Sequence, residues 1–199
     1  RDLELDKVKS EALMEIANRE FDNGNRELVI EVMKTVEAMS SNDDFIQSRI
    51  QISKTKLFLK ISDMNESLYA ASLISRDITR WDTLQLIACT YVEMDLLMEA
   101  LSVIDYIADD IEYATAQKAL CKILLSKGDE EAVVQLVEEI EDIEYQSEIF
   151  CLLGVLQGKN LQIEQAMDTI HQVGEDRIRV SGFLQLTKHL VDFGQIDRA

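Results

Sequence analysis

The side chains in this sequence that could carry chemistry are three cysteines, two histidines and many carboxylates. The cysteines are Cys89, Cys121 and Cys151, and an odd number at spacings of 32 and 30 residues does not form a disulfide framework. A zinc site needs four closely grouped Cys or His ligands, and the sequence holds no Cys-x-x-Cys pair. We therefore expect reduced, buried cysteines in an intracellular protein, with no metal and no cofactor.

The sequence also lacks the side-chain patterns of a catalytic triad and of a nucleotide-binding loop. His171 and His189 have no Ser or Cys neighbour with an orienting acid at the spacing of a catalytic triad. Neither G-x-x-x-x-G-K-[ST] nor G-x-G-x-x-G occurs, which counts against nucleotide binding. We expect a protein that is not an enzyme.

The carboxylates are concentrated in the middle of the chain. The 199 residues carry 38 acidic and 20 basic side chains, a net charge of −18, which argues against a nucleic-acid partner. No run of 18 apolar residues exists, so no membrane span is expected. Residues 81–158 hold 17 acids and three lysines, and residues 129–158 hold no base.

Two hypotheses compete for this acidity: solvated outer faces that keep the protein soluble, or a docking patch for a basic partner. No D-x-D-x-D-G loop supports calcium. The candidate acidic patch consists of Glu130, Glu131, Glu138, Glu139 and Glu141.

A repeat of 32 to 34 residues organises the chain. Its anchors are spaced by 33, 32, 34 and 33 residues, and the first four are each followed ten residues later by Asp: Ser67, Ala100, Ala132, Ala166 and Ala199. A looser copy precedes them, from Asn25 to Phe45. Such a period is typical of a solenoid whose units bury their apolar faces by stacking.

Each unit holds two apolar stripes of helical period, such as Trp81, Leu84, Ala88 and Tyr91 in one segment. We expect about eleven helices in antiparallel pairs and no strands. Turns between paired helices are predicted at the glycines and their substitutes: Gly24, Ser62-Asp63, Asp95, Gly128, Gly158 and Gly194. The repeated aspartates are predicted N-caps or first-turn acids: Asp77, Asp110, Asp142 and Asp176.

The unit resembles the tetratricopeptide repeat. That family has an aromatic residue, then Leu-Gly or Leu-Ala, Tyr, Gly, and an alanine early in the second helix. Three units of this sequence match: Ile87-Ala88, Tyr91 and Ala100; Leu153-Gly154 and Ala166; Phe183, Leu186, Gly194 and Ala199. The family's closing proline is absent throughout, and Asp stands near that junction.

The resemblance implies an all-α, right-handed superhelix of about six stacked helix pairs, forming one domain over residues 1–199. Because the chain begins at Arg1 and ends where another element would start, we expect a piece of a longer protein. In this family the first helix of each pair lines a concave groove that grips a peptide. The implied groove residues are Ser48, Gln51, Thr55, Phe58, Asp82, Gln85, Cys89, Glu93, Gln117, Cys121 and Leu124.

Two of these positions have a further interpretation. Cys89 and Cys121 lie 11 residues before Ala100 and Ala132, so two stacked thiols could form a redox pair. Small residues at helix contacts explain them more simply. Trp81, the single tryptophan, is expected to be a core aromatic rather than a ligand platform.

The predicted function is therefore a protein-interaction scaffold that binds a peptide or helical segment of another protein. If the acidic patch is the docking surface, that partner segment is expected to be basic. The alternative is a structural or self-assembling segment of a larger protein, because a helix left unpaired at Ile196 and Ala199 could stack on another copy. We expect a cytoplasmic protein; secretion stays an alternative, since a trimmed start would hide a signal peptide.

Overall fold

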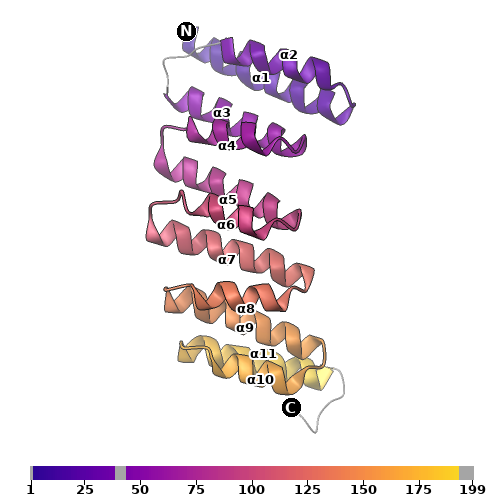
Figure 1. Cartoon of the computed structure of the whole chain (residues 1–199), viewed down its shortest axis with the longest axis vertical. Coiled ribbons are helices and arrows are strands. Elements are labelled where there is room, and N and C mark those ends of the chain that lie inside the picture. The colour runs from indigo at the N-terminus through magenta and orange to yellow at the C-terminus, as the bar shows by residue number, and fades with distance from the viewer. Residues whose placement is uncertain (1, 39–43, 193–199) are drawn as a thin grey trace. The chain divides into compact units, whose positions relative to one another are not determined.

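The computed structural model describes residues 2–38 and 44–192, which form eleven helices and no strand (Figure 1). The helices are α1 Asp2–Asp22, α2 Arg26–Ala38, α3 Asp44–Lys60, α4 Met64–Ser72, α5 Asp77–Glu93, α6 Leu97–Ile104, α7 Asp110–Lys127, α8 Glu130–Glu138, α9 Ile143–Lys159, α10 Ile163–His171 and α11 Asp176–Asp192. This confirms the predicted all-helical class and, over the described residues, the number of helices. The expected helix start at Ile196 and Ala199 and the turn at Gly194 lie outside the described residues.

The odd-numbered helices α1 to α9 end in one recurrent turn. In each, one residue adopts a left-handed φ between 59° and 80°: Gly24, Ser62, Asp95, Gly128 and Leu161. At α7 the Asp129 N–H donates to the Leu124 carbonyl at 3.0 Å, and the Gly128 N–H donates to the Leu125 carbonyl at 3.1 Å. This Schellman motif satisfies carbonyls that the helix end leaves free and reverses the chain into the next helix.

One predicted turn was wrong. Gly158 lies inside α9, and the turn falls three residues later, at Leu161 with φ 63°. Gly158 is needed for packing: a Cβ there would lie 2.3 Å from Leu186 Cδ1 of α11. The absent side chain therefore lets α11 approach α9, while a leucine adopts the conformation that usually selects glycine.

The repeated aspartates begin helices, as predicted. Asp142 is the N-cap of α9 and accepts from the Tyr145 N–H at 2.9 Å. The other three are the first residues of their helices: Asp77, Asp110 and Asp176. In α7 the cap itself is the preceding Asp109, which accepts from the N–H groups of residues 111 and 112. Each carboxylate lies at the positive end of a helix dipole, where it is stabilising.

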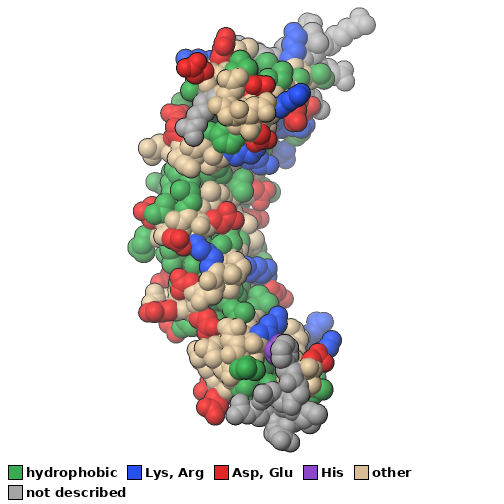
Figure 2. All heavy atoms as spheres, turned by 90° about the vertical axis from the view of Figure 1, so that its right-hand side faces the viewer, with side chains coloured by type: hydrophobic (Ala, Val, Ile, Leu, Met, Phe, Trp, Pro, Cys, Tyr) green, Lys and Arg blue, Asp and Glu red, His purple; other side chains and the backbone are tan. Residues whose placement is uncertain are grey.

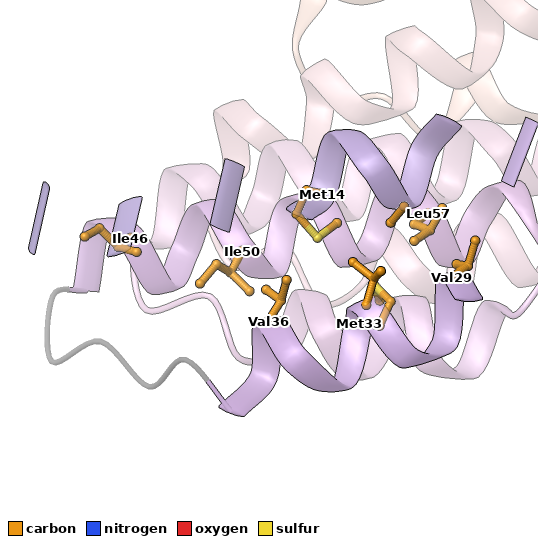
Figure 3. Packing of buried hydrophobic residues seen from close by; sticks show 9 residues of the cluster. Met14, Val29, Met33, Val36, Ile46, Ile50 and Leu57 are labelled. Atoms are coloured by element: carbon orange, nitrogen blue, oxygen red, sulfur yellow. The ribbon is translucent and has the colours of Figure 1, made fainter. Parts of the chain in front are cut away.

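The chain divides into two compact units, Arg1–Thr90 and Tyr91–Ala199. In the first, α1 packs on α2 and α3, and α3 packs on α4. Figure 3 shows the apolar side chains of α1, α2 and α3 pointing toward one another around Met14, Met33 and Leu57, which are 5%, 5% and 1% exposed. Burying each such side chain contributes about 1.5–3 kcal/mol, so the stacked pairs stabilise one another.

In the second unit the first helices lie side by side, α7 on α9 and α9 on α11. The second helix α8 contacts α7 and α9, and α10 contacts α9 and α11. The repeat anchors occupy the close contacts: Ala100 and Ala166 are both 0% exposed. A small residue there lets the second helix approach the first, which accounts for the alanine in the repeat.

Candidate protein-interaction surface

A hollow of about 780 Å³ lies along the first helices of the second unit. We call it the first-helix hollow and define it by its lining residues: Lys122 of α7; Glu144, Glu148, Cys151 and Leu152 of α9; and Glu175, Arg177, Ile178, Ser181 and Gln185 at α11. Leu152 is 42% exposed and offers an apolar contact between charges of both signs. Because three successive helices contribute, the hollow exists only once the repeats are stacked.

The side chains between α7 and α9 are held by a small set of contacts. The Lys118 ammonium forms an ion pair with Glu148 and lies 4.5 Å from the centre of the Tyr145 ring. The Lys118 side chain is only 17% exposed, so this pairing is partly shielded from solvent. It fixes the Glu148 carboxylate at the edge of the first-helix hollow.

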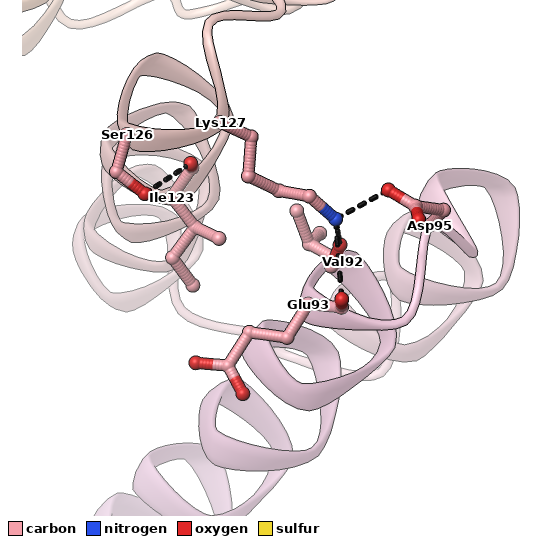
Figure 4. A network of polar contacts seen from close by, with 6 residues as sticks. All are labelled: Val92, Glu93, Asp95, Ile123, Ser126 and Lys127. Atoms are coloured by element: carbon pink, nitrogen blue, oxygen red, sulfur yellow. Dashed lines mark hydrogen bonds and ion pairs between the residues drawn. The ribbon is translucent and has the colours of Figure 1, made fainter.

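Lys127 caps the C-terminal end of α5 (Figure 4). Its Nζ donates to the carbonyl oxygens of Val92 at 2.8 Å and Glu93 at 3.1 Å, and it forms an ion pair with Asp95. A cation at a helix C-terminus complements the negative end of the dipole. Two of the three lysines of residues 81–158 are therefore engaged, and the exposed Lys122 lines the first-helix hollow.

The predicted groove residues fall into two groups. Six are at most 9% exposed: Ser48, Gln51, Thr55, Gln117, Cys121 and Leu124. The others are half-buried or exposed: Phe58, Gln85, Cys89, Asp82 and Glu93. None of the eleven lines the first-helix hollow, whose α7 contribution comes from Lys122, one residue beyond Cys121.

On α7 the predicted Cys121 and the hollow-lining Lys122 differ by one residue. Neighbouring residues on a helix point about 100° apart, so a shift of one position moves a side chain from an outer face to a buried one. The sequence signal that could have located the hollow is the repeated charged residue on the first helices, such as Glu148 and Lys122. Periodicity of apolar residues alone does not distinguish the two faces.

The predicted acidic patch divides between the two ends of α8. Glu130 and Glu131 lie in its first turn, and Glu138 and Glu139 lie at its last turn. Glu130 is half-buried and its Oε2 accepts from Gln157 Nε2 at 3.0 Å, whereas Glu131, Glu138, Glu139 and Glu141 are exposed. A helix of nine residues separates the two groups by roughly 12 Å.

Acidic side chains are also spread over the surface of the molecule. On the face drawn in Figure 2, acidic side chains lie in several separate groups, with hydrophobic and neutral side chains between them.

Two of the cysteines are unsuited to nucleophilic chemistry. None of the three forms a disulfide, and burial raises the pKa of Cys121 to about 12. Burial also raises the pKa of Cys151, with the nearby Glu148 charge adding to the effect. A reactive cysteine needs the opposite shift, because the thiolate is the nucleophile.

His171 makes an aromatic contact, and the described carboxylates form no metal-binding group. His171 packs edge-on against Phe183, with ring centroids 5.0 Å apart. Over residues 2–38 and 44–192, no three Asp, Glu, His or Cys side chains are grouped so that they could hold a metal ion. The same residues include no helix that is both long and apolar enough to cross a membrane. Trp81 is half-buried, with a buried Nε1 that has no hydrogen-bond partner among the residues that the structure describes.

Comparison with known proteins gives limited help. No protein-family model matches the chain, and no curated protein matches it. One similar solved structure contains nearly identical TPR-like repeats of a proposed kinesin light chain from Podosopora anserina. The match has 14% sequence identity and a TM-score of 0.46, and it covers 88% of this chain and 97% of that one. The structure itself shows the consecutively packed helix pairs of a helical repeat.

Proposed function

We propose that the chain is a non-enzymatic protein-interaction scaffold that binds an extended or helical segment of a partner along the first helices α7, α9 and α11. The observation that supports this is the first-helix hollow of about 780 Å³, built jointly by those three helices. A volume of this order matches the side chains of a peptide segment rather than a whole domain. Its lining offers an apolar contact at Leu152 and Ile178 together with donors and acceptors at the rim.

A basic partner fits the charge of this region best. Residues 81–158 carry a net charge of −14, which attracts cationic segments and raises their rate of association at low ionic strength. The three free cysteines support an intracellular location, where thiols stay reduced.

The test is capture of the partner with matched surface variants. Leu152→Arg places a charge in the first-helix hollow, whereas Leu184→Arg places one on α11, 66% exposed and outside that hollow. Proteins captured from a lysate by the wild type and by Leu184→Arg, but lost with Leu152→Arg, are the expected result. A partner retained equally by both variants would show that the hollow is not the binding surface.

Self-assembly is the second candidate, favoured by one observation on α11. Its outer side carries exposed apolar residues: Val180 at 58%, Leu184 at 66% and Val191 at 48%. Such a row is the kind of face that another helix pair covers in a solenoid. If this face joins two copies, light scattering gives a dimer mass for the wild type and a monomer for Leu184→Arg, with Leu152→Arg unchanged.

A further inference from the structure

A second pocket, of about 650 Å³, lies between the start of α7 and the connection from α8 to α9. We call it the acidic pocket. Four carboxylates line it: Asp110 on α7, and Glu139, Glu141 and Asp142 at the connection. No Lys, Arg or His is among its lining residues in the described chain. Asp142 is occupied as a helix cap, but the other three carboxylates form no hydrogen bond or ion pair with the described residues.

Helix stability explains Asp110 and Asp142, which lie at helix starts, but it does not explain the other two carboxylates of the pocket. Glu139 lies at the C-terminal end of α8, where the helix dipole disfavours a negative charge, and no basic residue lies in the last turn. Tyr113, which also lines the pocket, has its pKa raised by burial and further by the charges of Asp105 and Glu139. Both facts indicate negative potential at a pocket that has no Lys, Arg or His among its lining residues.

The acidic pocket is also lined by a buried side-chain amide, that of Gln117. The Gln117 side chain lines the acidic pocket, is only 2% exposed, and makes no hydrogen bond within the part of the chain that the structure describes. Because this amide has no hydrogen-bond partner among the described residues and faces the pocket, it is available to a polar group that enters the cavity. Its oxygen can accept from a cationic donor.

The rim adds apolar surface. Ile111 is 67% exposed although it follows directly on the helix start, and the Tyr113 ring is half-buried beside it. An aliphatic stem can pack on Ile111, and a planar cation can stack on an aromatic ring. These contacts suit a long side chain with a charged end.

We propose that the acidic pocket receives the guanidinium of an arginine carried by a partner segment, with Glu139, Glu141 and Asp110 as carboxylate acceptors and Gln117 as the inner acceptor. The carboxylates do not converge as metal ligands do, so a divalent cation fits poorly. Several separated acceptors around one cavity match the planar, five-donor guanidinium better than the compact ammonium of lysine. This inference rests on the proposed function, since it names a side chain that the scaffold would recognise.

The test is an NMR titration of the whole chain with acetyl-Gly-Arg-Gly amide, compared with the same peptide carrying citrulline or lysine. Citrulline keeps the shape and removes the charge. We expect shifts at the amides of residues 110–117 and 139–142, and roughly tenfold weaker binding of the citrulline and lysine peptides. Glu139→Gln combined with Glu141→Gln is expected to weaken the arginine peptide by about the same factor.

The matched control is Glu131→Gln combined with Glu164→Gln, which removes the same charge from exposed positions of α8 and α10 that do not line the acidic pocket. Its binding should stay within about twofold of wild type, because neither carboxylate can contact a side chain in the pocket and exposed charges are screened. Gln117→Met keeps the side-chain size and should also weaken binding, with thermal melting confirming the fold. Equal weakening in both double variants, or equal binding of the three peptides, would overturn the proposal.

The experiments can disprove the arginine site and the proposed scaffold function independently of each other. If the arginine peptide shows no specific binding while Leu152→Arg still abolishes partner capture, the guanidinium site is wrong and the scaffold function stands. If the peptide binds as described while Leu152→Arg leaves partner capture intact, the acidic pocket stands and the first-helix hollow is not the docking surface.

Discussion

At the scale of single residues, Gly154 illustrates how closely α10 approaches α9. A Cβ at this position would lie 2.5 Å from Ile170 Cγ1 and 3.1 Å from the Ala166 carbonyl oxygen. Replacing a helical glycine by alanine gains about 1 kcal/mol of helix propensity, but overpacking a filled contact costs about 1–3 kcal/mol. The backbone oxygen cannot move aside, so the steric cost should exceed the gain.

We therefore expect Gly154→Ala to lower the free energy of unfolding by roughly 1–2 kcal/mol, measured by urea denaturation. Gly174→Ala is the comparison, since Gly174 is exposed and lies outside the helices, and the nearest atom to its Cβ would be the side-chain Ile143 Cγ2 at 3.3 Å rather than a backbone atom. A Gly154→Ala protein as stable as wild type would show that the helices can separate without cost.

Cys121 makes the free energy of unfolding depend on pH in the alkaline range. Its folded pKa is raised to about 12 from an ordinary value of 9.0, so the thiol stays protonated in the fold while the unfolded chain ionises. Its contribution is complete below pH 9 and is lost as pH rises toward 12, at up to about 1.4 kcal/mol per pH unit. We expect the stability of Cys121→Ala to fall less steeply over that range, measured by urea denaturation at each pH. Parallel pH profiles would count against the expected contribution of Cys121.

At the scale of elements, the contact of Lys127 with the end of α5 should stabilise that helix end. Lys127→Met removes two hydrogen bonds to carbonyl oxygens and an ion pair with Asp95 but keeps much of the aliphatic length. Hydrogen bonds to charged groups contribute about 1.5–3 kcal/mol when shielded, and this side chain is 29% exposed.

The expected loss is about 1–2 kcal/mol in urea denaturation, toward the lower end because of that exposure. Lys122→Met serves as the control: it removes the same charge from α7, and Lys122 forms no comparable bonds within the described residues. Similar losses in both variants would mean that net charge matters and the carbonyl contacts do not.

At the scale of the whole molecule, the dominant electrostatic term is self-repulsion among the acids of residues 81–158. Salt screens charges separated by about 10 Å at 0.1 M, which is comparable to the spacing between the two ends of α8. We expect Tm to rise between 10 and 300 mM NaCl, in a scan followed by circular dichroism. Glu131→Gln combined with Glu138→Gln should reduce that rise, and a Tm independent of salt would argue against net repulsion.

What the sequence determines by itself is the repeating unit. The spacing of Ala100, Ala132 and Ala166 and the aspartates ten residues later predict helix pairs and their starting points, because helix periodicity, capping and close packing are local requirements. The turns at Gly24 and Gly128 follow from the same local rule. The turn at Leu161 could not be predicted, since leucine rarely adopts a positive φ and Gly158 is required by a contact with α11.

Only the tertiary structure decided which polar side chains are available. Gln117 and Cys121 were expected in one groove, yet packing buries Cys121, Gln117 lines the acidic pocket, and Lys122 lines the first-helix hollow. Glu130 and Glu139 look equivalent in sequence, but one accepts a hydrogen bond from Gln157 and the other lines the acidic pocket. The physical reason is that a helix assigns neighbouring residues to different faces, and the stacking of later helices determines which face stays open.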